Sequence, residues 1–188
     1  MKYQLSEYKS LVFDCDGVIL NSNKVKTDAF YNAAREYGEL EALSLVKFHI
    51  EFGGVSRFKK FKHFFKNILH REYSQFEYDK IISKYAQEVR NGLLTCEIAE
   101  GLADLRELTK NAVWFVASGG AQDELREVFH LRGLDKYFDG GVYGSPTPKD
   151  EIVKQQLEDG VVNTPALFLG DSRFDHEVAT EYSLDFVF

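Results

Sequence analysis

The chain has 188 residues, of which 44% are hydrophobic, and carries a net charge of −7. This length fits one compact domain or a core with a small insertion, and the charge argues against a nucleic-acid partner. There is no apolar run long enough to span a membrane, no signal peptide and no disulfide framework, so we expect a cytoplasmic protein.

The first predicted element is a buried strand in "SLVFDCD", residues 10–16. Its short apolar run, with a β-branched and an aromatic residue, is typical of a strand inside a sheet. The run ends in two acids one residue apart, Asp14 and Asp16, and Gly17 follows them. In an extended segment residues two apart point to the same side, so the two carboxylates can flank one reacting group if the chain bends there. Cys15 would then point into the core.

Residues 22–95 are predicted to form an all-helical insertion behind this strand. Residues 23–38 have apolar positions at helical spacing and stop at Gly38. A second helix over 56–70 places five apolar residues on one face: Phe58, Phe61, Phe65, Ile68 and Leu69. A further helix over 74–92 is predicted to end at Asn91-Gly92.

Strands and helices then alternate to the end of the chain. Helices are predicted over 97–109, 121–133, 148–160 and 174–182, and strands over 112–118, 140–145, 166–171 and 184–188. This alternation predicts a parallel sheet with helices on both faces. In such sheets, sites form beyond the carboxyl ends of the strands.

Polar residues follow successive strands at these carboxyl ends. They are Asp14 and Asp16, then Ser118-Gly119-Gly120, then Lys149, then Asp171 and Asp175. Carboxylates can hold Mg²⁺, a lysine can neutralise a transferring phosphoryl group, and backbone N–H groups beside glycines can bind its oxygens. Each residue alone also fits a helix cap, a turn or a solvated surface. Together, in chain order, they favour a phosphoryl-transfer site.

Four motifs carry a resemblance to the haloacid dehalogenase superfamily, whose members are mostly phosphatases: "FDCDGV", "VASGG", Lys149 in "SPTPKDEI", and "LGDSRFD". The helical insertion resembles the small cap of the phosphoglycolate phosphatase and β-phosphoglucomutase branch. The resemblance implies an α/β, Rossmann-like core of five parallel strands in the order 3-2-1-4-5. It also implies a core over 1–21 and 96–188, a cap over 22–95, and Mg²⁺ as cofactor.

The resemblance also implies a role for each motif residue. Asp14 would be the nucleophile that forms an aspartyl-phosphate, and Asp16 the general acid and then base. Lys149 would balance charge and contact the phosphate. The remaining phosphate-binding residues would be Gly17, Ser118 and Gly119. The metal would be held by Asp14, the backbone carbonyl of Asp16, Asp171 and Asp175, although Asp175 could instead orient a water or a neighbouring group.

The cap carries a basic stretch over 47–71. Five of its side chains group away from the phenylalanines and are predicted to face solvent: Lys59, Lys62, Lys66, His63 and His70. "GVSR" resembles a cap segment of β-phosphoglucomutases. We therefore expect Arg57 to contact an anionic or hydroxyl-rich part of the substrate, with Lys26 as a weaker candidate.

Two departures from the family pattern bear on activity. Asn21 stands where relatives often carry a third acid, so the contact that this acid makes in relatives is in question here. Gly170 stands before Asp171 where mutases tend to carry an acid, which favours a phosphatase.

The sequence thus predicts a Mg²⁺-dependent phosphatase that hydrolyses a small phosphorylated metabolite, either a sugar phosphate or a small phosphorylated acid. A phosphomutase and, less favoured, a catalytically silent binding module of the same fold are the alternatives. We expect neither nucleic acid nor membrane as a partner, and the sequence leaves the oligomeric state open.

Overall fold

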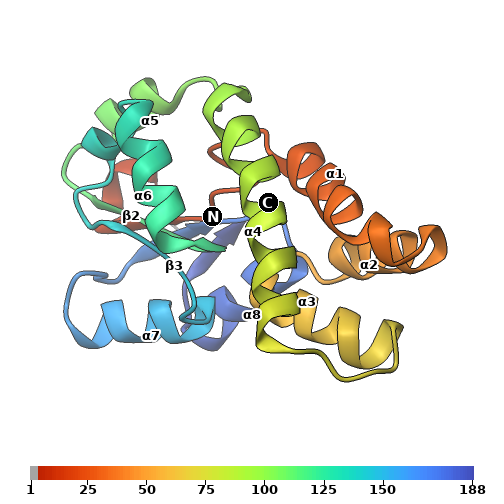
Figure 1. Cartoon of the computed structure of the whole chain (residues 1–188). Helices are drawn as coiled ribbons and strands as arrows, with labels where there is room; N and C mark the ends of the chain where they lie inside the picture. The colour runs from red at the N-terminus through yellow and green to blue at the C-terminus, as the bar shows by residue number, and fades with distance from the viewer. Residues whose placement is uncertain (1–3) are drawn as a thin grey trace.

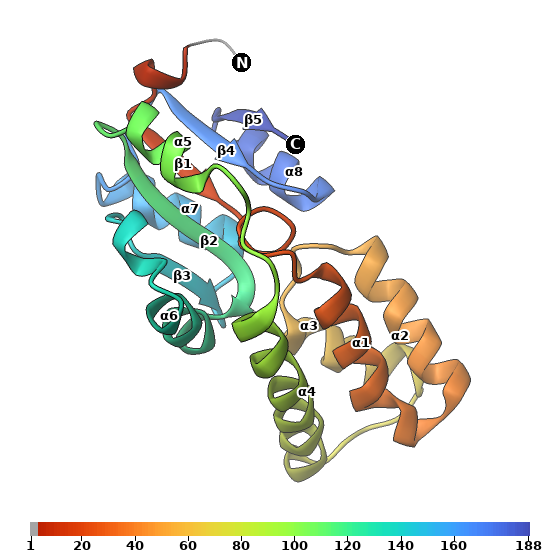
Figure 2. The ribbon, with the colours of Figure 1, turned by 90° about the horizontal axis from the view of Figure 1, so that it is seen from above.

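The computed structural model describes residues 4–188, and its centre is a five-stranded sheet (Figures 1 and 2). The strand order is β3-β2-β1-β4-β5 and every neighbouring pair is parallel, which confirms the predicted topology. The strands are β1 Ser10–Phe13, β2 Val113–Ala121, β3 Val142–Ser145, β4 Ala166–Leu169 and β5 Asp185–Val187.

Strand β1 lies at the centre of this sheet and is buried on both faces. None of its four residues is more than 1% exposed. Leu11 and Phe13 pack into the larger hydrophobic cluster, and Val12 into the smaller one on the opposite face. The alternation of side chains along a strand explains this division. Because β1 packs on both faces, its position is well defined. Asp14, the next residue, therefore has a defined position at the carboxyl end of the sheet.

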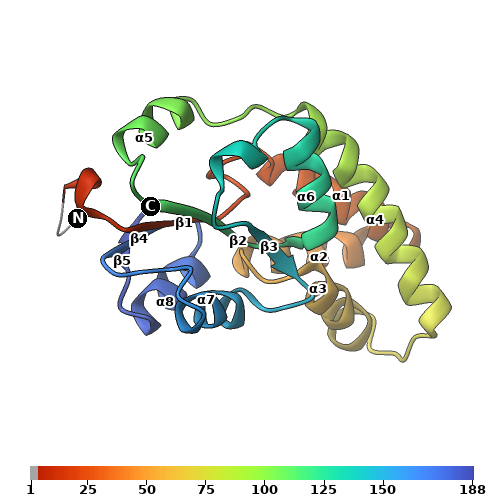
Figure 3. The same cartoon turned by 90° about the vertical axis from the view of Figure 1, so that its left-hand side faces the viewer.

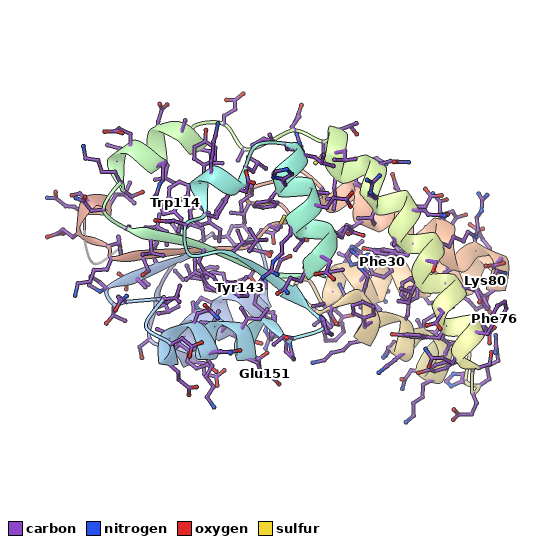
Figure 4. The ribbon with its side chains drawn as sticks, turned by 60° about the vertical axis from the view of Figure 1, so that its left-hand side comes forward. Phe30, Phe76, Lys80, Trp114, Tyr143 and Glu151 are labelled. Atoms are coloured by element: carbon purple, nitrogen blue, oxygen red, sulfur yellow. The ribbon has the colours of Figure 1, made fainter. Side chains whose placement is uncertain are left out.

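Four helices cover the two faces of the sheet (Figure 3). Helices α5 Leu102–Leu108 and α6 Gln122–Leu131 lie on one face, and α7 Lys149–Glu158 and α8 Arg173–Glu181 on the other. Beneath α5, Trp114 is fully buried, with its ring 4.6 Å from that of Phe13 (Figure 4). The predicted helix over 97–109 begins only at Leu102, because Gly101 before it adopts a left-handed conformation with φ 75°.

Four of the helices between β1 and β2 form a separate group beside the carboxyl ends of the strands (Figure 2). They are α1 Asn23–Ala34, α2 Glu39–Glu51, α3 Arg57–His63 and α4 Gln75–Thr95, and are called the cap below. The domain boundaries at 22 and 95 stay a prediction. No helix in the part of the chain that the structure describes combines the length and apolarity needed to cross a membrane.

Two predicted cap helices differ from the structure. Helix α4 does not end at Asn91-Gly92 but continues to Thr95. A Cβ atom at Gly92 would lie 2.2 Å from Cγ1 of Val25, so this glycine permits close packing of α4 against α1 rather than ending the helix. The single helix predicted over 56–70 is interrupted, because α3 ends at His63 and a π-helical segment, Phe64–Ile68, follows it.

The cap core gives a test of packing. We expect Phe30→Ala to lower the free energy of unfolding by about 3–5 kcal/mol, as is typical when a large aromatic core side chain is removed. Phe30 is 2% exposed, and its ring packs against those of Phe61 and Tyr85. Urea denaturation measures the loss.

The matched control is Phe76→Ala, in the first turn of α4, where this residue is 80% exposed (Figure 4). This control should change stability by less than about 0.5 kcal/mol. Equal losses in the two variants would contradict the packing described here.

Candidate active site

A cavity of about 760 Å³ lies between the carboxyl ends of the strands and the cap. Its volume is in the range of small-molecule sites. The core contributes Asp14, Asp16, Gly119, Gly120 and Asp171 to the wall, and the cap contributes Lys26, Phe30, His49, Arg57 and Lys60. Strand ends and cap helices therefore face one shared space.

Asp14 is the first residue after β1 and is 3% exposed. Its Oδ1 accepts a hydrogen bond from the backbone N–H of Cys15 at 2.7 Å and pairs with Nζ of Lys149 at 2.9 Å. Its Oδ2 accepts no hydrogen bond from the residues that the structure describes. Burial raises the pKa of Asp14 to about 7, against the opposing effect of Lys149. One oxygen is thus held, and the other is open to a ligand.

Lys149, the first residue of α7, is the cation at the centre of the site. Its side chain is completely buried and forms ion pairs with both Asp14 and Asp175. Burial alone would lower the pKa of this ammonium, but the two carboxylates outweigh it and raise the pKa above its usual value. Lys149 is therefore charged, as its proposed phosphate-binding role requires.

Asp175, predicted as a metal ligand, has both carboxylate oxygens engaged. Oδ1 accepts from Lys149, and Oδ2 accepts from the backbone N–H and the hydroxyl of Ser172, at 3.1 and 2.7 Å. With Ser172 it forms the capping box that begins α8. This arrangement fits a residue that positions Lys149, the second of the two roles considered for it.

Asp16 points its carboxylate toward the cap. Oδ1 accepts from the Ser22 hydroxyl at 2.5 Å, and Oδ2 pairs with Lys26 of α1. Burial opposes ionisation, yet Lys26 and the Ser22 hydrogen bond together lower the pKa of Asp16. Lys26, predicted as a substrate contact, therefore lies in the cavity wall but is paired with an acid of the core.

Asp171 follows β4 and is only partly buried. Its Oδ2 accepts from Nδ2 of Asn23 at 2.8 Å, and burial raises its pKa. Gly17 lies against it with φ 75°, and a Cβ at Gly17 would come 2.0 Å from Asp171 Oδ2. The N–H of Gly17 donates to the Leu20 carbonyl, and phosphate binding by this residue stays a prediction.

The acidic groups at the strand ends fit a divalent cation. Oxygen atoms of Asp14, Asp171 and Asp175 lie within 4.8 Å of one another. Because Lys149 and Ser172 engage Asp175, the carboxylates left for a metal are those of Asp14 and Asp171. Hard oxygen donors of this kind are the ligands that Mg²⁺ prefers.

The end of β2 supplies the predicted phosphate-binding segment. Gly119 and Gly120 line the cavity, whereas Ser118 is fully buried and its Oγ accepts from the N–H of Gly120 at 3.0 Å. A Cβ at Gly119 would lie 2.4 Å from the carbonyl oxygen of Gly54. A glycine at 119 is therefore required for the cap segment before α3 to approach the core this closely.

Arg57, at the start of α3, bridges the cap to the core. Its guanidinium pairs with Glu124 of α6, with Nη1 3.0 Å from Oε2, and lies 4.6 Å from the ring centre of Tyr85. Its buried Nε has no hydrogen-bond partner among the described residues. The predicted substrate contact thus lines the cavity with its charge already paired.

The cavity residues that the sequence analysis did not single out include Lys60 of α3 and His49 of α2. Nζ of Lys60 lies 2.8 Å from Nδ1 and 3.3 Å from the carbonyl oxygen of His49. Burial lowers the pKa of Lys60 to about 7 and that of His49 to about 3. The spacing of Lys60 three residues after Arg57 puts both on one helical face, a signal that could have identified it.

Comparisons with known proteins identify the family and the fold. The sequence profile of the haloacid dehalogenase-like hydrolase family matches residues 11–188. The chain belongs to this family. A comparison with curated protein sequences finds no match.

Solved structures share the fold at low sequence identity. A predicted phosphoglycolate phosphatase from Haemophilus somnus has a TM-score of 0.73 at 14% identity, covering 97% of this chain and 85% of its own. A predicted phosphatase from Clostridium acetobutylicum has a TM-score of 0.72 at 18% identity, with 95% and 83% covered. A haloacid dehalogenase superfamily hydrolase from Geobacter sulfurreducens has a TM-score of 0.59 at 20% identity, with 95% and 85% covered.

The ion pairs of Lys149 predict a cost for removing one acid. We expect Asp175→Asn to lower the free energy of unfolding by about 3–5 kcal/mol, because a buried ammonium loses one of its two counter-charges. The matched control on the same helix is Glu177→Gln, whose ion pair with Arg173 is exposed. The control should lower the free energy of unfolding, measured by urea denaturation, by less than about 1 kcal/mol. A similar small loss for both variants would contradict a buried, charged Lys149.

The lowered pKa of Lys60 predicts a pH-dependent stability. The pKa is about 7 in the folded protein against a usual value of 10.5. Between these values the unfolded chain holds a proton that the folded protein lacks, so Lys60 adds a rise of stability with pH. We expect Lys60→Met to remove this rise, so that its stability advantage over the wild type, on the order of a few kcal/mol near pH 7, shrinks toward pH 10.

The measurement is urea denaturation at several pH values across this window, with the exposed Lys62→Met as control. A difference between Lys60→Met and wild type that stays constant with pH would contradict the prediction.

Proposed function

We propose that this protein is a Mg²⁺-dependent phosphatase that hydrolyses a small phosphomonoester through a phosphorylated Asp14. The observation that carries the proposal is the state of Asp14. It stands at the end of the central strand, with one oxygen held by Lys149 and the Cys15 amide and the other unengaged in a cavity of small-molecule size. Family membership and the phosphatase names of structural relatives support the same activity.

In the first half of the proposed reaction, Oδ2 of Asp14 attacks phosphorus and the bond to the leaving oxygen breaks. Lys149 lies beside the attacking carboxylate and balances the charge of the phosphoryl group. Asp14, Asp171 and the backbone carbonyl of Asp16 would hold Mg²⁺, which supplies further positive charge to the phosphoryl oxygens. Covalent catalysis divides one difficult hydrolysis into two easier steps.

Proton transfer falls to Asp16 in this proposal. Its carboxyl group gives a proton to the leaving oxygen, and the carboxylate then takes one from the water that attacks the aspartyl-phosphate. The ion pair with Lys26 favours the carboxylate form, so Asp16 must leave Lys26 before it can act as an acid. Lys26 of the cap thus influences the protonation of Asp16 in the core.

The phosphomutase alternative differs in its product. A mutase returns the phosphoryl group to a sugar, whereas a phosphatase releases inorganic phosphate. Gly170 before Asp171 favours the phosphatase, and no contact of the described residues favours the mutase. This proposal keeps three further predictions: a cytoplasmic location, a small phosphorylated metabolite as substrate, and neither nucleic acid nor membrane as a partner.

A panel of phosphomonoesters, assayed for phosphate release with and without a chelator, tests the proposal. We expect hydrolysis that requires Mg²⁺ and falls by more than about 1,000-fold in Asp14→Asn, because the nucleophile is lost. The matched control is Asp104→Asn, an exposed acid of α5, which should retain full activity. Hydrolysis that persists in Asp14→Asn, or that ignores the chelator, would overturn the mechanism. An isomeric sugar phosphate as product would instead identify a mutase.

A further inference from the structure

The cavity extends beyond the reacting end of the proposed site into the cap. Asp14 and Asp171 line it from the core, and His49, Phe30 and Lys60 line it from α2, α1 and α3. At about 760 Å³ it holds more than a phosphate group, whose volume is comparable to a few water molecules. The cavity therefore has room for the non-reacting part of a substrate beside these cap residues.

Four basic side chains line this cavity among the described residues, and three of them already have an acid partner. Lys26 pairs with Asp16, Arg57 with Glu124, and Arg173 with Glu177. Lys60 forms no ion pair within the part of the chain that the structure describes. It is nonetheless 2% exposed, so water does not replace the missing acid.

The partners of Lys60 are neutral acceptors, namely Nδ1 and the carbonyl oxygen of His49. The nearest ring is that of Phe30, with its centre 5.6 Å from Nζ. A buried ammonium without a counter-charge is costly, which is why the pKa of Lys60 is lowered. An anion entering the cavity would supply that counter-charge.

His49 holds the Lys60 ammonium at the cavity wall through these two acceptors. When Nδ1 accepts from the charged Lys60, the proton of the neutral imidazole is on Nε2, which leaves one N–H. Because Nε2 is on the far side of the ring from Nδ1, that N–H points away from Lys60, and the ammonium is the group that matches an oxygen of a carboxylate or phosphate. Neither group is used by the proposed chemistry at Asp14.

We propose that Lys60, held in place by His49, forms a specificity site for a second anionic group on the substrate. This inference rests on the proposed function, since it concerns the same cavity, and it narrows the substrate class. The substrate would be a small phosphomonoester with an anion at its non-reacting end, either a carboxylate or a second phosphate. Such a substrate completes the charge pairing that the folded protein leaves open at Lys60.

Two pairs of substrates test the inference, each matched except for the second anion. The first is 2-phosphoglycolate against ethyl phosphate, and the second is fructose 1,6-bisphosphate against fructose 6-phosphate. We expect the wild type to have the higher kcat/KM for the member that carries the second anion in one of the pairs, and that pair identifies the anion. Lys60→Met should reduce this preference by about 10- to 100-fold, while the kcat/KM for the partner lacking the anion changes by less than about 3-fold.

Two further variants distinguish loss of the anion contact from misfolding of the protein. Lys62→Met makes the same change at an exposed lysine of α3 and should leave the preference intact. Lys60→Arg keeps the charge and should restore part of the preference. A loss of kcat/KM in Lys60→Met that is equal for both members of a pair, or a wild type without preference, would overturn the specificity site and leave the phosphatase proposal standing.

If the wild type hydrolyses none of these four compounds, calorimetric binding tests the anion site separately, and the wider panel of phosphomonoesters decides the proposed function. Binding of 2-phosphoglycolate or fructose 1,6-bisphosphate that is tighter than that of its partner, and is lost in Lys60→Met, supports the anion site without catalysis. If the two members of each pair bind equally well, or if the difference in affinity persists in Lys60→Met, the anion site is overturned.

Discussion

The site depends on the buried contact of one ammonium with two carboxylates. Lys149 begins α7, Asp14 follows β1, and Asp175 lies in the first turn of α8, so three separate segments meet at one charge. Each charge alone would be costly to bury, and the three are tolerable only together. This requirement fixes the carboxyl end of the central strand relative to two helices. It also leaves one oxygen of Asp14 unengaged, which is the property on which the proposed chemistry rests.

Charge pairing also organises the boundary between cap and core. Lys26 of the cap pairs with Asp16 of the core, and Arg57 of the cap with Glu124 of the core. Both pairs join buried or nearly buried groups, so moving the cap away would separate charges that have little access to water. The cap therefore both closes the cavity and sets the state of the proposed acid–base residue. Lys60 stands apart because its charge faces the cavity without an acid.

Much of the core could be predicted from the sequence. The hydrophobic run of β1 is followed directly by Asp14, Ser118 lies near the carboxyl end of β2, and Lys149 and Asp171 come after β3 and β4. Parallel strands with aligned carboxyl ends bring these positions together. Local patterns were less reliable within the cap. Gly92 has the sequence signature of a helix end, yet α4 continues through it, because its missing side chain accommodates Val25. A glycine that serves packing cannot be distinguished by sequence from one that ends a helix.

The sequence by itself determined which residues lie at the carboxyl ends of the strands, because strand position and motif order are local properties of the chain. Only the tertiary structure decided what those residues contact. Arg57 meets Glu124 across 67 positions of sequence, and the Asp175 carboxylate engages Lys149. Lys60 lies in a run of lysines whose other members face solvent, and only its burial against α2 distinguishes it. Charge pairing depends on distance in space, and distance in space depends on packing that no short stretch of sequence contains.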